Sequence, residues 1–217
     1  MVFNLIPVIS QFPLTTLVPE WFYLFSGLIY FAVAAISFFI SYFSFRLFNV
    51  TSSKSHSVLS LSFLLIGIAF GMLSFVSLYT YQNSAALNPN IFNLNENTYN
   101  IYYIFALAAY ILLTMINLPK KKSEFFVFVP LWFISSPGFL ATAILFLFYI
   151  SARSVMNFFK VKTEDAFLVM FAFLMITLFH IFLLLMPFGI ELYLAAHAFL
   201  IVGFLSLLAM LIRVTRK

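Results

Sequence analysis

Long apolar stretches restrict the fold of this chain more than any other feature. The sequence contains several runs of roughly eighteen or more predominantly apolar residues, and about 20 such residues in a helix span the hydrocarbon layer of a bilayer. Hydrophobic residues make up 65% of the chain and charged residues 8%, whereas a soluble domain is about half apolar and about one quarter charged. A water-soluble fold is therefore excluded, and we predict an all-α, polytopic integral membrane bundle embedded in lipid.

Most of the predicted spans have clear limits, but one apolar stretch does not. Residues 125–152 fit either one long tilted helix or two short helices that turn at Pro137-Gly138, a dipeptide that favours turns. The Asn-rich residues 82–97 are predicted to form an outward-facing loop. The other spans are predicted at residues 20–46, 57–81, 99–118, 165–186 and 190–212.

The basic residues decide between one and two helices in the ambiguous stretch. With one helix, the eleven Lys and Arg residues divide five against six between the two sides of the membrane; with two helices, all eleven lie on one side. Lys and Arg concentrate in the cytoplasmic loops of membrane proteins. We therefore predict seven transmembrane helices, with the N-terminus outside and the C-terminus in the cytoplasm.

The N-terminal segment differs from the rest of the chain. Residues 1–19 are interrupted by three prolines and contain no Lys or Arg, which argues against a straight spanning helix and against a signal peptide. We predict an outer-side segment that lies at the membrane interface. Residues 20–217 are predicted to form one seven-helix membrane domain.

Two similar sequence runs indicate an internal repeat within this domain. Ser62–Ile66 and Ala172–Ile176 are alike, and each follows a basic loop. They predict a three-plus-one-plus-three plan with triplets at residues 20–118 and 138–213. Such parallel triplets occur in some transporters.

Two histidines are the ionisable residues predicted to lie within the bilayer, where such residues are costly and often functional. At about 1.5 Å per residue, His180 and His197 lie at similar depths in the outer third of the last two spans. A tight turn at 187–189 makes these spans antiparallel neighbours, so the two rings are placed to face each other. Tyr193 precedes His197 by one helical turn and shares its face, which makes it a predicted supporting partner.

Several roles remain open for the histidine pair. The candidate ligand-binding residues are His180, His197, Tyr193 and Tyr103, and they suit a proton-linked ligand or a quinone. Alternatively, the two imidazoles are axial ligands of a b-type haem, although no cofactor or metal is predicted in the first instance. The third alternative is structural, with each imidazole bonded to a backbone carbonyl or to a neighbouring side chain from the set Tyr102, Tyr103 and Thr177.

Small residues form a stripe on the second predicted span. Gly67, Gly71 and Ser74 lie one helical turn apart, and such spacing permits close approach between membrane helices. We predict packing within the bundle, with homodimerisation or contact with a membrane-protein partner as the alternatives.

Other function classes are disfavoured by the sequence. The net charge of +5 arises from short loops between spans, so it does not predict nucleic-acid binding. The chain has no Cys, which removes disulfides and thiol nucleophiles. It also lacks a phosphate-binding loop, a Ser–His–Asp set and a His-Glu-x-x-His motif, so we predict no enzyme.

The last span resembles a known group of membrane proteins. The run His197–Leu205, followed by Leu211–Val214, is similar to the last span of small archaeal seven-helix integral membrane proteins, some of which resemble the membrane input domains of sensor kinases. Tyr149–Arg153 fits the end of the fifth span in the same group. The resemblance covers most of residues 20–213 and implies the fold and a sensing or accessory role, but no catalytic residue. Because the chain ends soon after the last predicted span, we expect no output domain.

The combined prediction is a non-catalytic multi-pass protein of the cell membrane. It is sensor-like or an accessory subunit, and it binds a small or membrane-soluble ligand. The alternatives are an electron-transfer subunit with a haem held by His180 and His197, and a small-solute transporter built on parallel triple-helix repeats.

Overall fold

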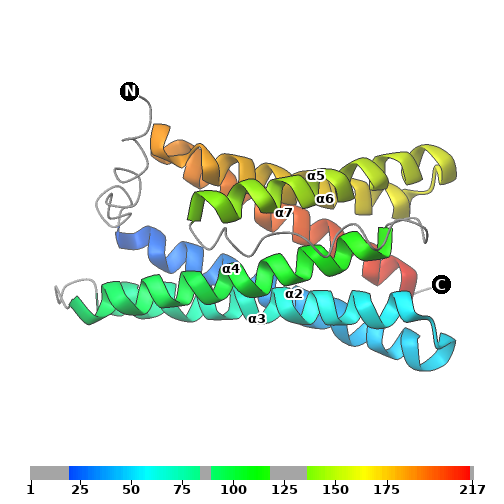
Figure 1. Ribbon diagram of the computed structural model, residues 1–217, viewed down its shortest axis with the longest axis horizontal. Coiled ribbons are helices and arrows are strands. Elements are labelled where there is room, and N and C mark those ends of the chain that lie inside the picture. The colour runs from blue at the N-terminus through cyan, green and yellow to red at the C-terminus, as the bar shows by residue number, and fades with distance from the viewer. Residues whose placement is uncertain (1–19, 84–88, 118–135, 216–217) are drawn as a thin grey trace.

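The structure is a computed structural model that describes residues 20–83, 89–117 and 136–215, and these residues form an all-α bundle (Figure 1). Six of its helices are long and apolar enough to cross a membrane. The six helices are α2 (Glu20–Thr51), α3 (Lys54–Gln82), α4 (Pro89–Asn117), α5 (Ser136–Val161), α6 (Glu164–Leu184) and α7 (Ile190–Thr215), and the short helix η3 (Met186–Phe188) precedes α7.

The predicted spans are confirmed as helices wherever the structure describes them. The predicted fourth span lies mostly before Ser136 and therefore outside the described residues. The loop predicted at 82–97 was wrong from residue 89 onward, because α4 begins at Pro89, and residues 84–88 lie outside the described residues. Proline is well suited to the first turn of a helix, where its missing N–H has no intrahelical partner. The asparagines that suggested a loop instead extend this helix beyond its apolar part.

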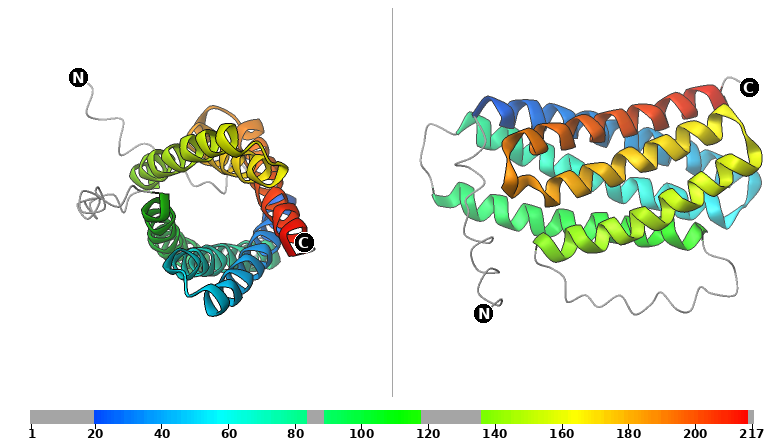
Figure 2. Two further views of the ribbon diagram at one scale, coloured as in Figure 1. Left: turned by 90° about the vertical axis from the view of Figure 1, so that its right-hand side faces the viewer. Right: turned by 90° about the horizontal axis from the view of Figure 1, so that it is seen from above.

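The helices form a ring in chain order, and α7 returns to contact α2 (Figure 2). Neighbouring helices within α2–α4 and within α5–α7 are antiparallel, whereas α4 and α5 run in the same direction. The ring of Tyr103 on α4 stacks on Phe139 near the start of α5, and the Tyr149 hydroxyl farther along α5 donates to the carbonyl of Asn117 at the end of α4. The end of α4 and the start of α5 therefore lie at opposite ends of the bundle.

We refer to α2–α4 as the first half and α5–α7 as the second half. The halves meet along two seams, α4 with α5 and α2 with α7, and the helices are parallel at both. At the second seam Phe22 contacts Tyr193, and Tyr30 contacts His197 one to two turns farther along both helices. The two halves therefore point the same way through the bundle.

The turns within the two halves share one geometry. Ser52 follows α2 and Lys162 follows α5, and within the described chain these are the non-glycine residues with positive φ, at 53° and 52°. The N–H of Ser52 donates to the carbonyl of Phe48 at 2.7 Å, and the N–H of Lys162 donates to that of Phe158 at 2.8 Å. Ser52 and Lys162 are separated along the chain by the same interval as Ser62–Ile66 and Ala172–Ile176. The hairpins α2–α3 and α5–α6 are therefore similar in both sequence and turn.

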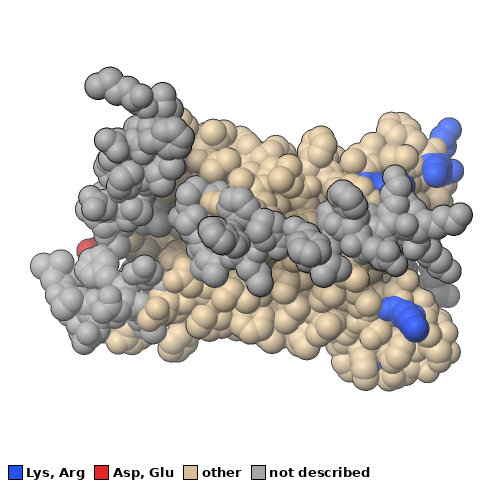
Figure 3. Space-filling view, viewed as in Figure 1, with Lys and Arg blue, Asp and Glu red and all other residues tan. Residues whose placement is uncertain are grey.

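The described basic residues gather at one end of the bundle. On the face in Figure 3, the Lys and Arg atoms lie at one end and the visible acidic atoms at the other. At the basic end, Arg213 of α7 pairs with Glu164 and Asp165 at the start of α6. The described basic residues are Arg46, Lys54, Arg153, Lys160, Lys162 and Arg213. This is the polarity that a membrane protein shows when that end is cytoplasmic.

Large apolar side chains cover the outside of the bundle. Phe31, Phe75, Leu145 and Phe148 each expose more than 60% of their surface. Exposed apolar surface of this extent is stable when it faces lipid, so the structure fits a multi-pass protein embedded in a bilayer.

The small-residue stripe on α3 lies against α2. The hydroxyl of Ser74 donates to the carbonyl of Gly27 at 2.8 Å, and a Cβ added to Gly67 would lie 2.8 Å from the ring of Phe38. Gly71 also faces α2, where a Cβ would lie 3.9 Å from that of Ala34. The stripe is therefore covered within the first half.

Aromatic side chains fill the space where the two halves meet. The ring of Phe70, which is 1% exposed, contacts the rings of Tyr30 and Tyr102 from the first half and of Phe179 and Phe204 from the second. The ring centroids lie between 5.4 and 6.3 Å from that of Phe70. We call these five residues the central aromatic cluster.

Candidate functional site

His197 is fully buried and uses both ring nitrogens. Its Nδ1 lies 2.9 Å from the carbonyl oxygen of Tyr193, and its Nε2 lies 2.7 Å from the hydroxyl oxygen of Tyr30. A carbonyl only accepts, so Nδ1 carries the proton. In the neutral ring Nε2 is then an acceptor, and the hydroxyl of Tyr30 donates to it. These partners fix the tautomer and the orientation of the ring.

His180 repeats this arrangement on the neighbouring helix. Its Nδ1 lies 2.9 Å from the carbonyl oxygen of Ile176, and its Nε2 lies 3.3 Å from the hydroxyl oxygen of Tyr110. Both His180 and Tyr110 are buried. By the same argument, Nδ1 donates to the carbonyl and the hydroxyl of Tyr110 donates to Nε2.

Each histidine–tyrosine pair joins the two halves of the bundle. Both histidines belong to the second half, His180 on α6 and His197 on α7. Their tyrosines belong to the first half, Tyr110 on α4 and Tyr30 on α2. A shift of one half against the other would therefore lengthen these bonds.

The two imidazoles contact separate tyrosines. We expected the rings to face each other, but each faces its own phenol. The ring of Phe179 lies beside both, with its centroid 4.8 Å from that of His180 and 6.1 Å from that of His197. The depth of the two histidines along their helices could be predicted from spacing, whereas the direction of each ring depends on its partner.

The hydroxyl of Tyr102 is a polar group in the interior that lacks a partner. Tyr102 is 3% exposed, and among the described residues its hydroxyl makes no hydrogen bond. Its ring packs against Phe70 and against Phe139 of α5. Tyr102 also lies close enough to Tyr30 and to Tyr110 to interact with both electrostatically. This hydroxyl therefore lies near both histidine–tyrosine pairs.

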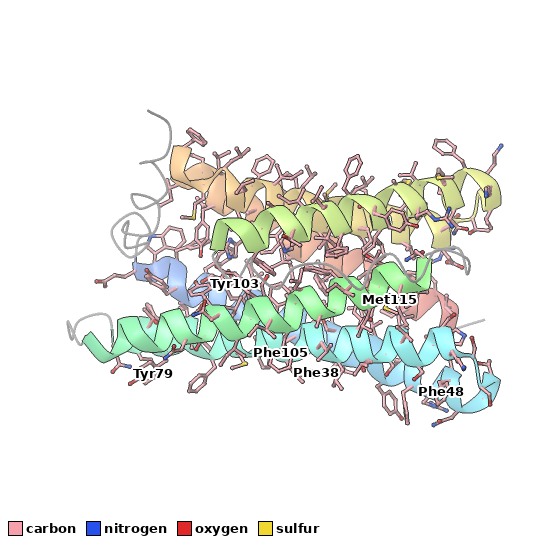
Figure 4. The ribbon with its side chains drawn as sticks, viewed as in Figure 1. Phe38, Phe48, Tyr79, Tyr103, Phe105 and Met115 are labelled. Atoms are coloured by element: carbon pink, nitrogen blue, oxygen red, sulfur yellow. The ribbon has the colours of Figure 1, made fainter. Side chains whose placement is uncertain are left out.

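The other two predicted site residues, Tyr193 and Tyr103, contact different histidine–tyrosine pairs or their neighbours. The ring of Tyr193 meets His197 edge to face at 4.5 Å, and its hydroxyl lies near that of Tyr30. Tyr103 lies on the side of α4 that is turned toward α5 (Figure 4), where it stacks on Phe139 at 4.3 Å. The centroid of Phe139 is in turn 6.2 Å from that of His180.

Sequence reasoning missed both tyrosines that bond to the histidines. The partners that it considered were Tyr102, Tyr103, Thr177 and backbone carbonyls. Tyr30 and Tyr110 lie well inside apolar helices, away from the interface. A tyrosine buried in the middle of an apolar helix needs a hydrogen-bond partner for its hydroxyl. The positions of Tyr30 and Tyr110 in the sequence could therefore have indicated them as partners of the histidines.

The histidines as arranged do not fit an axially ligated haem. Each Nε2, the atom that would bind iron, accepts a hydrogen bond from a phenol, while each Nδ1 is bonded to its own helix. Ligation would require both phenols to leave. Within the part of the chain that the structure describes, no three His, Asp or Glu residues form a group suited to a metal ion.

No family model, curated protein or solved structure matches this chain. The resemblance to small seven-helix proteins and to sensor input domains therefore stays a prediction.

Proposed function

We propose that this protein is a non-catalytic, seven-span protein of the cell membrane that binds a small, membrane-soluble ligand between its two halves. Its role would be that of a sensor or of an accessory subunit of a larger membrane complex. The observation that carries the proposal is the buried Tyr102 hydroxyl, which has no partner among the described residues.

The seven-span topology rests on the direction of the helices. Because α4 and α5 are parallel, the end of α4 and the start of α5 lie at opposite ends of the bundle. One further crossing brings the total to seven and leaves every described Lys and Arg on the same side as Lys120, Lys121 and Lys122. The N-terminal side is then outside the cell.

The energetics of the interior support a ligand site. A buried hydroxyl without a hydrogen bond costs about 1–3 kcal/mol, and a bound molecule that accepts its proton removes that cost. The surrounding rings of Phe70 and Phe139 offer apolar contact. Small-molecule sites in proteins commonly combine mostly apolar walls with a few placed polar groups.

The position of this hydroxyl supports a sensing role. A ligand on Tyr102 would touch both halves, since Tyr102 is on α4 and Phe139 is on α5. The hydrogen bonds from Tyr110 to His180 and from Tyr30 to His197 also join the two halves. A ligand that favours one relative position of the halves shifts the protein toward that position.

Recovery of a co-purifying molecule tests the proposal without knowledge of its identity. The wild type, Tyr102→Phe and Tyr79→Phe are purified from the same membranes, and the small molecules that each releases on denaturation are quantified by mass spectrometry. Tyr79 is an exposed tyrosine on α3 and serves as the matched control. We expect one species to be retained by the wild type and the control, and to be reduced at least about tenfold in Tyr102→Phe. Identical contents in all three proteins would contradict ligand binding at Tyr102.

A small-solute transporter is the second candidate, and the shared hairpin geometry favours it. Parallel repeats that move against each other give alternating access in known transporters. The matching turns at Ser52 and Lys162 are what such a repeat produces. The central aromatic cluster favours the first proposal, because polar solutes need a polar route where Phe70 now packs against Phe179 and Phe204.

A further inference from the structure

We infer that the site at Tyr102 takes a neutral, planar, apolar molecule that carries a carbonyl oxygen, such as a quinone. The inference rests on the proposed function, since it assigns a chemical class to the ligand of that site. It follows from three observations on the described residues, namely that the Tyr102 hydroxyl has no acceptor, that no charged side chain acts on it and that its ring contacts are aromatic.

The hydrogen bonds around Tyr102 indicate that the ligand carries a hydrogen-bond acceptor. The hydroxyl protons of Tyr30 and Tyr110 are used on the two histidines, and the Nδ1 protons of those histidines are used on carbonyls. No atom of the described residues accepts the proton of the Tyr102 hydroxyl. A carbonyl oxygen accepts this proton and brings no donor of its own, so no polar hydrogen is left unpaired.

The distribution of charged side chains indicates that the ligand is neutral. The described carboxylates and the described Lys and Arg side chains lie at the two ends of the bundle, and the described ionisable groups that act on Tyr102 are the phenols of Tyr99, Tyr103 and Tyr110. An ion placed there would be buried without a counter-charge, which is strongly unfavourable.

The aromatic neighbours of Tyr102 favour a planar ligand. The rings of Phe70, Tyr103 and Phe139 surround Tyr102, with centroids 5.4 to 5.7 Å from that of Tyr102. The rings of Tyr103 and Phe139 are themselves stacked at an interplanar angle of 29°. Such surfaces favour flat aromatic or conjugated molecules over bulky saturated ones.

The seam between α4 and α5 is the place where these three observations combine. Tyr102 and Tyr103 belong to α4 and Phe139 to α5, so the site is formed by both halves. Tyr103 and Leu140 are partly exposed beside it.

Two probes of matched shape test the assignment. Menadione has a methylnaphthalene skeleton with two carbonyl groups, and 2-methylnaphthalene has the skeleton alone. The binding of each to the full chain in lipid nanodiscs is measured at equilibrium, and binding to empty nanodiscs is subtracted. The proteins are the wild type, Tyr102→Phe and the control Tyr79→Phe, with thermal unfolding used to verify that each is folded.

The expected result is saturable binding of menadione to the wild type and to Tyr79→Phe, about tenfold tighter than the binding of 2-methylnaphthalene. In Tyr102→Phe the preference should disappear. Equal binding of both probes to the wild type would overturn the carbonyl assignment while leaving a ligand site in place. A preference that survives in Tyr102→Phe would overturn the assignment to this residue. Saturable binding of neither probe would overturn the assigned ligand class, whereas the proposed function is contradicted only by identical small-molecule contents in the co-purification experiment.

Discussion

Replacement of Phe70 by alanine should lower the free energy of unfolding by about 3–5 kcal/mol, the range for the loss of a buried aromatic ring. Phe70 is 1% exposed, and its ring is the one that contacts Tyr30, Tyr102, Phe179 and Phe204 together. Its removal therefore leaves a void between the two halves. The quantity to measure is the midpoint and slope of denaturant unfolding in detergent micelles.

Phe75→Ala is the matched control for this prediction. Phe75 is on the same helix but is 65% exposed, so its ring faces lipid or detergent. Its loss should change the free energy of unfolding by about 0.5 kcal/mol or less. Similar losses for Phe70→Ala and Phe75→Ala would mean that the central aromatic cluster does not hold the halves together.

Three tyrosine-to-phenylalanine changes should differ in sign. Tyr30→Phe and Tyr110→Phe each remove the only donor that the structure gives to a buried imidazole Nε2. Each should destabilise the bundle by about 1–2 kcal/mol, because a buried acceptor is left unpaired. Tyr102→Phe removes a buried hydroxyl that makes no bond among the described residues. After extraction of small molecules, it should unfold at the same denaturant concentration as the wild type or at a higher one.

Comparison of these variants distinguishes the structural role of Tyr30 and Tyr110 from the ligand-binding role of Tyr102. Denaturant unfolding of Tyr30→Phe, Tyr110→Phe and Tyr102→Phe under identical conditions gives the three free energies. If the wild type and Tyr30→Phe were equally stable, the bond to His197 would not contribute to packing. If Tyr102→Phe were the least stable of the three, its hydroxyl would have a partner in the folded protein, and the argument for a ligand there would fail.

The course of the chain through the membrane could largely be predicted from sequence, because a bilayer reduces the problem to the length and polarity of each segment. Five predicted spans coincide with described helices, and every described Lys and Arg lies at one end. Charge asymmetry also predicted that the chain turns back before Lys160 and Lys162. The parallel course of α4 and α5 agrees with that prediction.

The start of α4 and the partners of the histidines could not be predicted in this way. Polarity alone does not distinguish an Asn-rich loop from the polar first turns of a helix, so Pro89 was missed as a helix start. The side chain that meets His197 lies in the first helix, far away in sequence. Helix spacing identifies which face a residue shares with its own neighbours. It contains no information about which helix of the ring packs opposite.

The central claim is that the two halves of the bundle point the same way through the membrane, and cysteine accessibility tests it most directly. The chain has no native Cys, so single replacements at Ser53, Lys162, Asn83 and Glu191 each give one labelling site. We predict that Ser53→Cys and Lys162→Cys react with a membrane-impermeant maleimide only after the cells are permeabilised, and that Asn83→Cys and Glu191→Cys react in intact cells. Reaction of Ser53→Cys and Lys162→Cys from opposite sides of the membrane would contradict the account.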